Sequence, residues 1–263
     1  MDRYLLYTAA AVFLYMLFMF FAALFKKDNS IVDIAWGGGF ILVAVLTFFL
    51  NGDRSLRSLI VTCLVVIWGS RLALYIFIRH RGKGEDFRYA KWRKEWGQWF
   101  ILRSFFQIFM LQGLLLLIIS YSVILVNHSP KESLTVLDYV GVLVWLIGFF
   151  FEAVGDYQLS KFKKSPENKG RIMKYGLWRC TRHPNYFGES VMWWGIFLIA
   201  LSVRYGWTAV ISPLVITFLL LRVSGVIMLE KKYKENDEYA EYVRETNAFL
   251  PWLPKKRPES SVK

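Results

Sequence analysis

Residues Ile31–Leu50 read IVDIAWGGGFILVAVLTFFL, an apolar run in which Asp33 is the only charged residue. The hydrocarbon core of a bilayer is about 30 Å thick, and a helix needs about 20 residues to cross it. Lipid offers the backbone no hydrogen-bond partners, so such a run satisfies its own N–H and C=O groups by forming a helix. The stretch therefore predicts a membrane-spanning helix.

Six further runs have a similar length and composition. They are Tyr4–Phe25, Ser58–Ile78, Phe100–Val126, Leu137–Asp156, Tyr186–Val203 and Trp207–Leu229. The 263-residue chain is 56% hydrophobic and 18% aromatic, which is too apolar for an ordinary soluble domain. The first run is longer than the apolar part of a signal peptide, so we expect it to be retained as a helix.

The sequence thus predicts an all-α polytopic membrane protein with about seven transmembrane helices. We expect one domain over residues 1–263, with the transmembrane bundle at 1–229 and a cytoplasmic C-terminal segment at 230–263.

The net charge of +13 is concentrated in three segments of the chain. These are residues 79–99, residues 158–182 and the tail after Leu229, whereas 127–136 and the link at Arg204 hold one Lys or Arg each. Seven spans put the three basic segments on one side, which the positive-inside rule makes cytoplasmic, with the N-terminus outside. Topology and attraction to anionic membrane lipids explain much of this charge. No nucleic-acid-binding motif accompanies it, so we expect no nucleic-acid partner.

Three polar side chains follow one another near the end of the third run. Arg71, Tyr75 and Arg79 are spaced by four residues and therefore share one helix face. Two guanidinium groups beside a phenol suit a ligand that carries phosphate. The alternative is a stripe that snorkels toward the basic segment, and Arg71 lies two turns too deep for this to be its simplest explanation.

Two further pairs at four-residue spacing flank the second basic segment. Glu152 and Asp156 end the fifth run, while Asn185 and Glu189 begin the sixth. Two carboxylates on one helix face repel each other unless a cation or a hydroxyl-rich ligand lies between them. An ion pair with an arginine or lysine is the alternative explanation.

The stretch Thr181–Glu189, TRHPNYFGE, places several polar groups where a cationic loop meets an apolar helix. Burying His183, Asn185 and Tyr186 beside lipid costs several kcal/mol unless a partner binds them. The start of a helix also attracts anions, although Glu189 acts against this. The stretch therefore predicts the rim of a ligand site.

Asp33 lies close to Gly37-Gly38-Gly39 in the second run. Glycines let another helix or a flat ligand approach closely, and an acid beside them is a candidate proton donor. The alternative is a helix-packing seam in which Asp33 pairs with an arginine.

The remaining motifs exclude some classes of site. Cys63 and Cys180 form no disulfide framework, and no histidines stand at metal-ligand spacing, so we expect no metal site. The aromatic and charged stretch that starts at Glu230 and Tyr233 is either a lid over the cytoplasmic mouth or an interfacial amphipathic helix.

Four motifs together resemble a known family. Gly176–Glu189 resembles the signature of the steroid 5-alpha-reductase superfamily, and Trp68–Leu72, Gly84–Tyr89 and Thr246–Pro251 agree with its bacterial branch, the DUF1295 family. The resemblance implies a seven-helix membrane enzyme in the bacterial inner membrane, with its cofactor entering from the cytoplasm. Reductase members use NADPH to reduce the 4,5 double bond of a 3-oxo-4-ene steroid.

The resemblance also implies roles for individual residues. The positions that match the family's cofactor contacts are Arg71, Tyr75, Asp156, Lys163, Asn185 and Glu189, and Glu152, Glu230 and Tyr233 fall near further ones. Arg171, as a phosphate contact, and His183 and Tyr186, beside the nicotinamide, complete the candidate cofactor-binding residues. Animal reductases have Asn at the position of Glu152 and Arg at that of Lys163. They polarise the 3-oxo group with a Gln-Glu pair in the second span and a Tyr in the third, where this chain has Asp33 and Trp68 as candidate catalytic residues.

The favoured hypothesis is hydride transfer from NADPH to a conjugated C=C of a flat, lipophilic enone that enters from the bilayer. An S-adenosylmethionine-dependent methyltransferase of the isoprenylcysteine or phospholipid type is the alternative, because such enzymes resemble Arg182-His183-Pro184 and the acidic-aromatic segment at Glu230. A non-enzymatic lipid-binding membrane protein is the third possibility.

Overall fold

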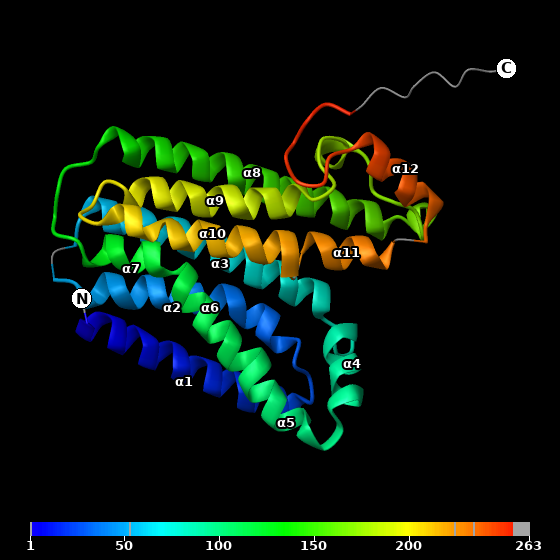
Figure 1. Cartoon of the computed structure of the whole chain (residues 1–263), viewed down its shortest axis with the longest axis horizontal. Helices are drawn as coiled ribbons and strands as arrows, with labels where there is room; N and C mark the ends of the chain where they lie inside the picture. The colour runs from blue at the N-terminus through cyan, green and yellow to red at the C-terminus, as the bar shows by residue number, and fades with distance from the viewer. Residues whose placement is uncertain (1, 53, 224, 234, 255–263) are drawn as a thin grey trace. The chain divides into compact units, whose positions relative to one another are not determined.

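The fold is helical throughout the described part of the chain. A computed structural model describes residues 2–52, 54–223, 225–233 and 235–254, and no strand occurs among them. The all-α prediction is therefore confirmed. The first helices are α1 (Asp2–Lys26), α2 (Ile31–Leu50) and α3 (Leu56–His80), which match the first three predicted spans (Figure 1).

Six helical stretches of the described residues are long and apolar enough to cross a membrane. Besides α1, α2 and α3, they are Phe87–Ile119, α8 (Val136–Lys164) and Gly206–Met228. The predicted span Tyr186–Val203 corresponds to α9 (Pro184–Ala200), a shorter helix of 17 residues. A polytopic membrane protein is thus supported, while the count of seven spans and the outside N-terminus stay predictions.

The fourth predicted span, Phe100–Val126, is broken rather than continuous. It consists of α5 (Phe100–Arg103), a π-helical stretch (Ser104–Met110), α6 (Leu111–Ile119) and α7 (Tyr121–His128). The break at Ser120 takes the Ser122 N–H out of the regular pattern, and this N–H donates to the Ser212 hydroxyl at 3.0 Å. A side chain distant in sequence thus satisfies the backbone group that the break exposes.

The chain divides into two compact units. The first comprises residues 1–139 and 196–212, and the second comprises 140–195 and 213–263. The first holds the helices up to α7, including α4 (Phe87–Trp96). The second holds most of α8 and α9, together with α11 (Val226–Lys232) and α12 (Asp237–Glu245). The helix α10 (Ile211–Phe218) has its last six residues in the second unit. A single domain stays a prediction.

The glycines of α2 form contacts between helices in the first unit. A Cβ added at Gly37 would lie 2.5 Å from the Gly69 carbonyl oxygen of α3, and one at Gly38 would lie 2.6 Å from the Tyr15 hydroxyl of α1. A Cβ at Gly39 would overlap the Leu116 side chain of α6. The three glycines therefore face three different helices, which is the packing seam rather than an opening for a flat ligand.

In the second unit, glycines at seven-residue spacing line the contact between α8 and α9. Figure 1 shows these two helices side by side. A Cβ at Gly148 would lie 2.5 Å from the Gly188 carbonyl oxygen, and one at Gly195 would lie 2.6 Å from that of Gly141. Small residues allow such close backbone approach, which gains van der Waals contact where lipid provides no hydrophobic driving force. The pairing sets the register of α8 against the start of α9.

Candidate functional site

The residues before α9 in the second unit are held by one arginine. The Arg182 guanidinium donates to Glu230 Oε1 from Nε (2.9 Å) and Nη2 (2.6 Å), and to the Thr246 carbonyl from Nη1 (2.5 Å). Its backbone N–H donates to the Asn247 carbonyl. Arg182 thus joins the start of α9, the end of α11 and the chain that follows α12.

Further bonds attach the C-terminal stretch to the loop before α9. The Thr181 hydroxyl donates to the Phe249 carbonyl at 2.9 Å, and the Trp252 N–H donates to the Cys180 carbonyl at 2.9 Å. The Tyr242 hydroxyl of α12 donates to the Trp178 carbonyl. The stretch after α12 is therefore packed onto the second unit.

His183 and Asn185 carry buried polar atoms without partners. His183 is 4% exposed, its ring stacks on Tyr186 with centroids 5.6 Å apart, and its Nδ1 has no partner within the described residues, whereas its Nε2 faces Glu230 Oε1 at 3.5 Å. Asn185 Nδ2 donates to Asp156 Oδ1 at 3.1 Å, while Asn185 Oδ1 has no partner there. Buried polar atoms are almost always hydrogen-bonded, so two unpaired ones at the start of one helix make this a candidate ligand site.

Acidic side chains surround these atoms in the second unit. Glu152, Asp156 and Glu189 are all buried. Glu230 lies beside His183, whose Nε2 is 3.5 Å from Glu230 Oε1. His183 and the hydrogen bonds from Arg182 lower the pKa of Glu230. The carboxylate is therefore held in its charged form next to the His183 ring.

A small cationic cavity lies in the loop region of the second unit. Its volume is about 110 Å³, and it is lined by Phe162, Asn168, Arg171, Ile172, Lys174, Tyr175 and Glu238. Lys174 Nζ is 3.3 Å from Glu238 Oε1, so one of the two cations is paired. Tyr233 packs against the neighbouring cluster of Ile172, Tyr239 and Tyr242.

The other predicted residues lie in the first unit. The guanidinium groups of Arg71 and Arg79 lie 5.5 and 5.7 Å from the Tyr75 ring centroid, so the three share one helix face. Trp68 is fully buried, with its ring 5.2 Å from that of Phe40. Asp33 Oδ2 accepts from Arg88 Nη2 at 2.6 Å.

Sequence reasoning missed the partners of Asp33. Its second oxygen, Oδ1, accepts from the Tyr89 hydroxyl at 2.7 Å, and Tyr89 is almost completely buried. Arg88 and Tyr89 belong to the Gly84–Tyr89 motif, but no spacing in the sequence relates them to α2. The arginine partner that the packing alternative required is thus present.

The structure brings several predicted residues into contact. Asn185 meets Asp156, and His183 meets both Tyr186 and Glu230. Arg171 lines the cationic cavity, and Lys163 is exposed on α8. On α3, the Arg71 guanidinium lies 5.5 Å from the Tyr75 ring centroid.

The model of the family described as protein of unknown function (DUF1295) matches residues 19–246 of the chain. The chain belongs to the steroid 5-alpha-reductase-like DUF1295 family. The resemblance that the four motifs predicted is confirmed.

Relatives of this DUF1295 protein match parts of it. The 3-oxo-5-alpha-steroid 4-dehydrogenase 1 of Rattus norvegicus is 24% identical over 115 residues, 43% of this chain and 40% of the rat protein. The protein of the same name from Bos taurus is 32% identical over 78 residues, 30% of each chain. A probable O-methyltransferase of Ustilaginoidea virens is 33% identical over 66 residues, 25% of this chain and 23% of its own length. Each match thus covers less than half of the relative.

Proposed function

We propose that this DUF1295 protein is a membrane-embedded reductase that uses NADPH to reduce a conjugated C=C of a lipophilic enone. Two relatives named as 3-oxo-5-alpha-steroid 4-dehydrogenases support an oxidoreductase at the level of the family. The observation that carries the proposal is the pair of buried polar atoms without partners, His183 Nδ1 and Asn185 Oδ1.

The chemistry of these atoms fits the nicotinamide riboside part of the cofactor. A neutral imidazole donates from one ring nitrogen and accepts at the other, and an amide oxygen accepts. A carboxamide and ribose hydroxyls offer both donors and acceptors, so they would satisfy both atoms. When bound, NADPH supplies the hydride, and the protein binds and orients it.

Cationic side chains of the second unit would hold the phosphates. Arg171 and Lys174 line a cavity that is smaller than the several hundred Å³ of a typical ligand pocket, so it fits one phosphate group rather than a whole dinucleotide. Lys163 is exposed on the same unit and adds positive charge. In the first unit, Arg71 and Tyr75 remain proposed cofactor contacts.

The proposed chemistry at the substrate carbonyl involves Asp33. Negative charge develops on that oxygen during reduction and needs a donor. Both carboxylate oxygens of Asp33 accept hydrogen bonds, one of them from the Tyr89 hydroxyl, so Asp33 would orient that hydroxyl and the proton would come from Tyr89 rather than from the carboxylate. Trp68 is proposed to contact the substrate from α3.

Cofactor binding to the detergent-purified full chain tests the proposal. Isothermal titration should show binding of NADPH and none of S-adenosylmethionine. His183→Ala should weaken NADPH binding about tenfold, since a lost hydrogen bond in a buried site costs about 1–3 kcal/mol. His128→Ala is the matched control, because His128 Nδ1 is also buried and unpaired but lies in α7 of the first unit.

A methyltransferase is the second candidate, and one observation favours it. The probable O-methyltransferase of Ustilaginoidea virens shares a 66-residue match, and the Arg182–Glu230 ion pair joins the residues that this alternative uses. If the protein binds S-adenosylmethionine and does not bind NADPH, the methyltransferase becomes the proposed function in place of the reductase. Binding of neither would favour a lipid-binding protein without catalysis.

A further inference from the structure

The helix α4 of the first unit lies across the direction of α1 and α3, beyond the end of α3 (Figure 1). Its ten residues include Arg88, Lys91, Arg93, Lys94 and Glu95. Charges at this density are too costly for the hydrocarbon core of a bilayer. A turn at Gly97, with φ of 49°, separates α4 from the apolar helices that begin at Phe100. The helix therefore lies at the end of the membrane-spanning segments rather than inside the bilayer.

One face of α4 is fixed to the first unit by its own charges. Arg88 pairs with Asp33 and with Asp86, while Arg93 pairs with Glu85 at 2.8 Å. Between them, the Tyr89 ring is buried in an apolar cluster with Phe20 and Ile108. Each arginine is thereby paired with a carboxylate, so the two add little to the net charge of the surface.

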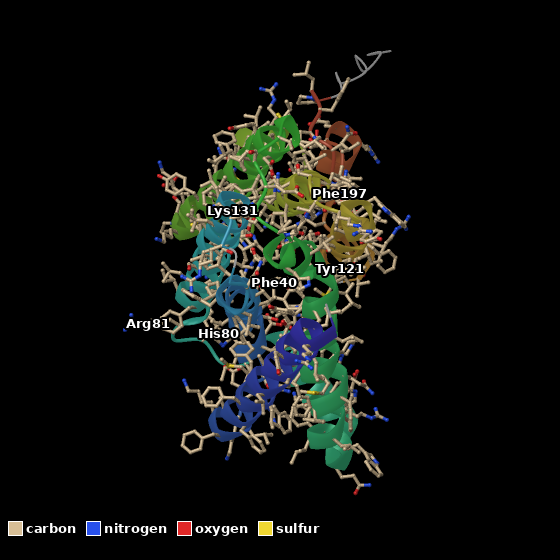
Figure 2. The ribbon with its side chains drawn as sticks, turned by 90° about the vertical axis from the view of Figure 1, so that its left-hand side faces the viewer. Phe40, His80, Arg81, Tyr121, Lys131 and Phe197 are labelled. Carbon is tan, nitrogen blue, oxygen red and sulfur yellow. The ribbon has the colours of Figure 1, made fainter. Side chains whose placement is uncertain are left out.

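The opposite face of α4 is basic and aromatic. Phe87, Lys91 and Lys94 follow at helical spacing, all are exposed, and Phe87 is 61% exposed. Arg81 and Lys83 are exposed just before α4, and Figure 2 shows the Arg81 side chain pointing away from the ribbon. We call these five residues the α4 surface.

Negative charge does little to offset this surface. Among exposed residues of 81–99, Glu95 is the single acid, and its carboxylate lies 3.6 Å from Lys91. Trp99 is also exposed, at 55%, shortly after the helix. Four cations and one acid next to exposed aromatic rings make a surface of net positive charge with an apolar component.

We propose that the α4 surface binds the headgroups of anionic phospholipids. Lys and Arg attract the negative headgroups, and aromatic rings partition into the boundary between headgroups and acyl chains. The position of α4 beyond the end of α3 brings the surface to this boundary. The inference does not depend on NADPH or on any enzymatic activity.

Native mass spectrometry of the delipidated full chain tests this site. The protein is mixed with equal amounts of palmitoyl-oleoyl phosphatidylglycerol and phosphatidylcholine, and bound lipids are counted. The wild type should retain phosphatidylglycerol in about tenfold preference, given the contribution of each basic residue near an anionic surface. The combined variant Arg81→Gln, Lys83→Gln, Lys91→Gln, Lys94→Gln should lose most of this preference.

The matched control removes the same charge elsewhere. Lys161→Gln, Lys164→Gln, Lys169→Gln and Arg179→Gln change four exposed cations of the second unit and should leave the preference nearly intact. Equal retention of both lipids by the wild type, or an equal loss in the control, would overturn the proposal.

A second measurement uses thermal stability. A lipid that binds the folded state raises the Tm, so phosphatidylglycerol should raise the wild-type Tm more than that of the α4 variant. The difference should shrink at high salt because exposed charges are screened. A Tm increase that is the same in both proteins would count against the site.

Discussion

At the scale of single residues, the ion pairs of Arg182 and Asp33 have different surroundings. Arg182 joins the start of α9 to Glu230 and to carbonyl groups after α12, next to polar atoms that have no partner. Asp33 joins α2 to Arg88 and Tyr89 of α4, with both oxygens occupied. The Arg182–Glu230 pair therefore lies beside polar atoms that still lack hydrogen-bond partners. The Asp33–Arg88 pair has all the partners of its carboxylate within the protein.

Because of Glu230, the thermal stability of the protein should depend on pH. The pKa of Glu230 is lower in the folded state than in the unfolded state, where it is about 4.3. Glu230 therefore stabilises the folded protein above about pH 4.3, and this stabilisation is lost as the pH falls through the folded-state pKa. We therefore expect the Tm of the detergent-purified protein to fall below about pH 4.3, and Glu230→Gln to reduce this dependence. Glu167→Gln, on an exposed residue of the same unit, is the control. An unchanged pH profile in Glu230→Gln would contradict the assignment.

Asp33→Asn separates a catalytic role from a packing role. We expect turnover of NADPH with a 3-oxo-4-ene steroid probe to be lost while NADPH affinity is retained. Because Arg88 loses a charged partner, the Tm should also fall, by an amount that Asp86→Asn helps to calibrate, since Asp86 pairs with the same arginine. Turnover equal to that of the wild type would remove Asp33 from the mechanism.

At the scale of elements, close helix pairs define each unit. The seven-residue spacing of Gly141, Gly148 and Gly155 repeats on α9 at Gly188 and Gly195. A spacing of seven returns to nearly the same helix face, so both helices present a continuous line of small residues. This contact places Glu152 beside Gly188 and Gly155 beside Pro184, at the start of α9.

Gly148→Ala should disturb this helix pair. The new methyl group would lie 2.5 Å from the Gly188 carbonyl oxygen and 2.7 Å from the Met192 nitrogen, both of which are backbone atoms that cannot rotate away. We expect a destabilisation of about 1–3 kcal/mol, visible as a lower Tm in detergent. Gly52→Ala, where no atom lies within 4 Å, is the control and should have little effect. An equal Tm for both variants would argue against the close contact.

At the scale of the whole molecule, the chain is a helical membrane protein of the DUF1295 family with two compact units. Its basic segments contain the residues proposed for the phosphates and the α4 surface. The proposed function therefore requires these basic segments to lie on the cytoplasmic side of the membrane, where nucleotide cofactors are available.

Cysteine labelling tests this orientation. Cys63→Ser and Cys180→Ser provide a background without thiols, because these are the two cysteines of the chain. In intact bacterial cells, a membrane-impermeant maleimide should label Lys131→Cys and should reach Lys83→Cys only after permeabilisation. Both positions are exposed. The reverse pattern would place the cofactor residues outside and contradict the predicted topology.

The sequence by itself determined most of the long apolar helices and their approximate bounds, and its motifs identified the family. The helices follow from local rules, because lipid requires each spanning segment to satisfy its own backbone and to be apolar over its length. The stretch Thr181–Glu189 was also identified in this way, since its polar residues stand out against an apolar helix.

Only the tertiary structure decided which side chains meet. Asp33 pairs with Arg88, 55 residues away, and Arg182 with Glu230, 48 residues away, and no spacing in the sequence specifies either pair. Packing also decided that Gly37, Gly38 and Gly39 face other helices, and that His183 is buried with no partner at Nδ1. The physical reason is that a helix forms from contacts within a few residues, whereas a site forms where distant helices expose or satisfy each other's polar groups.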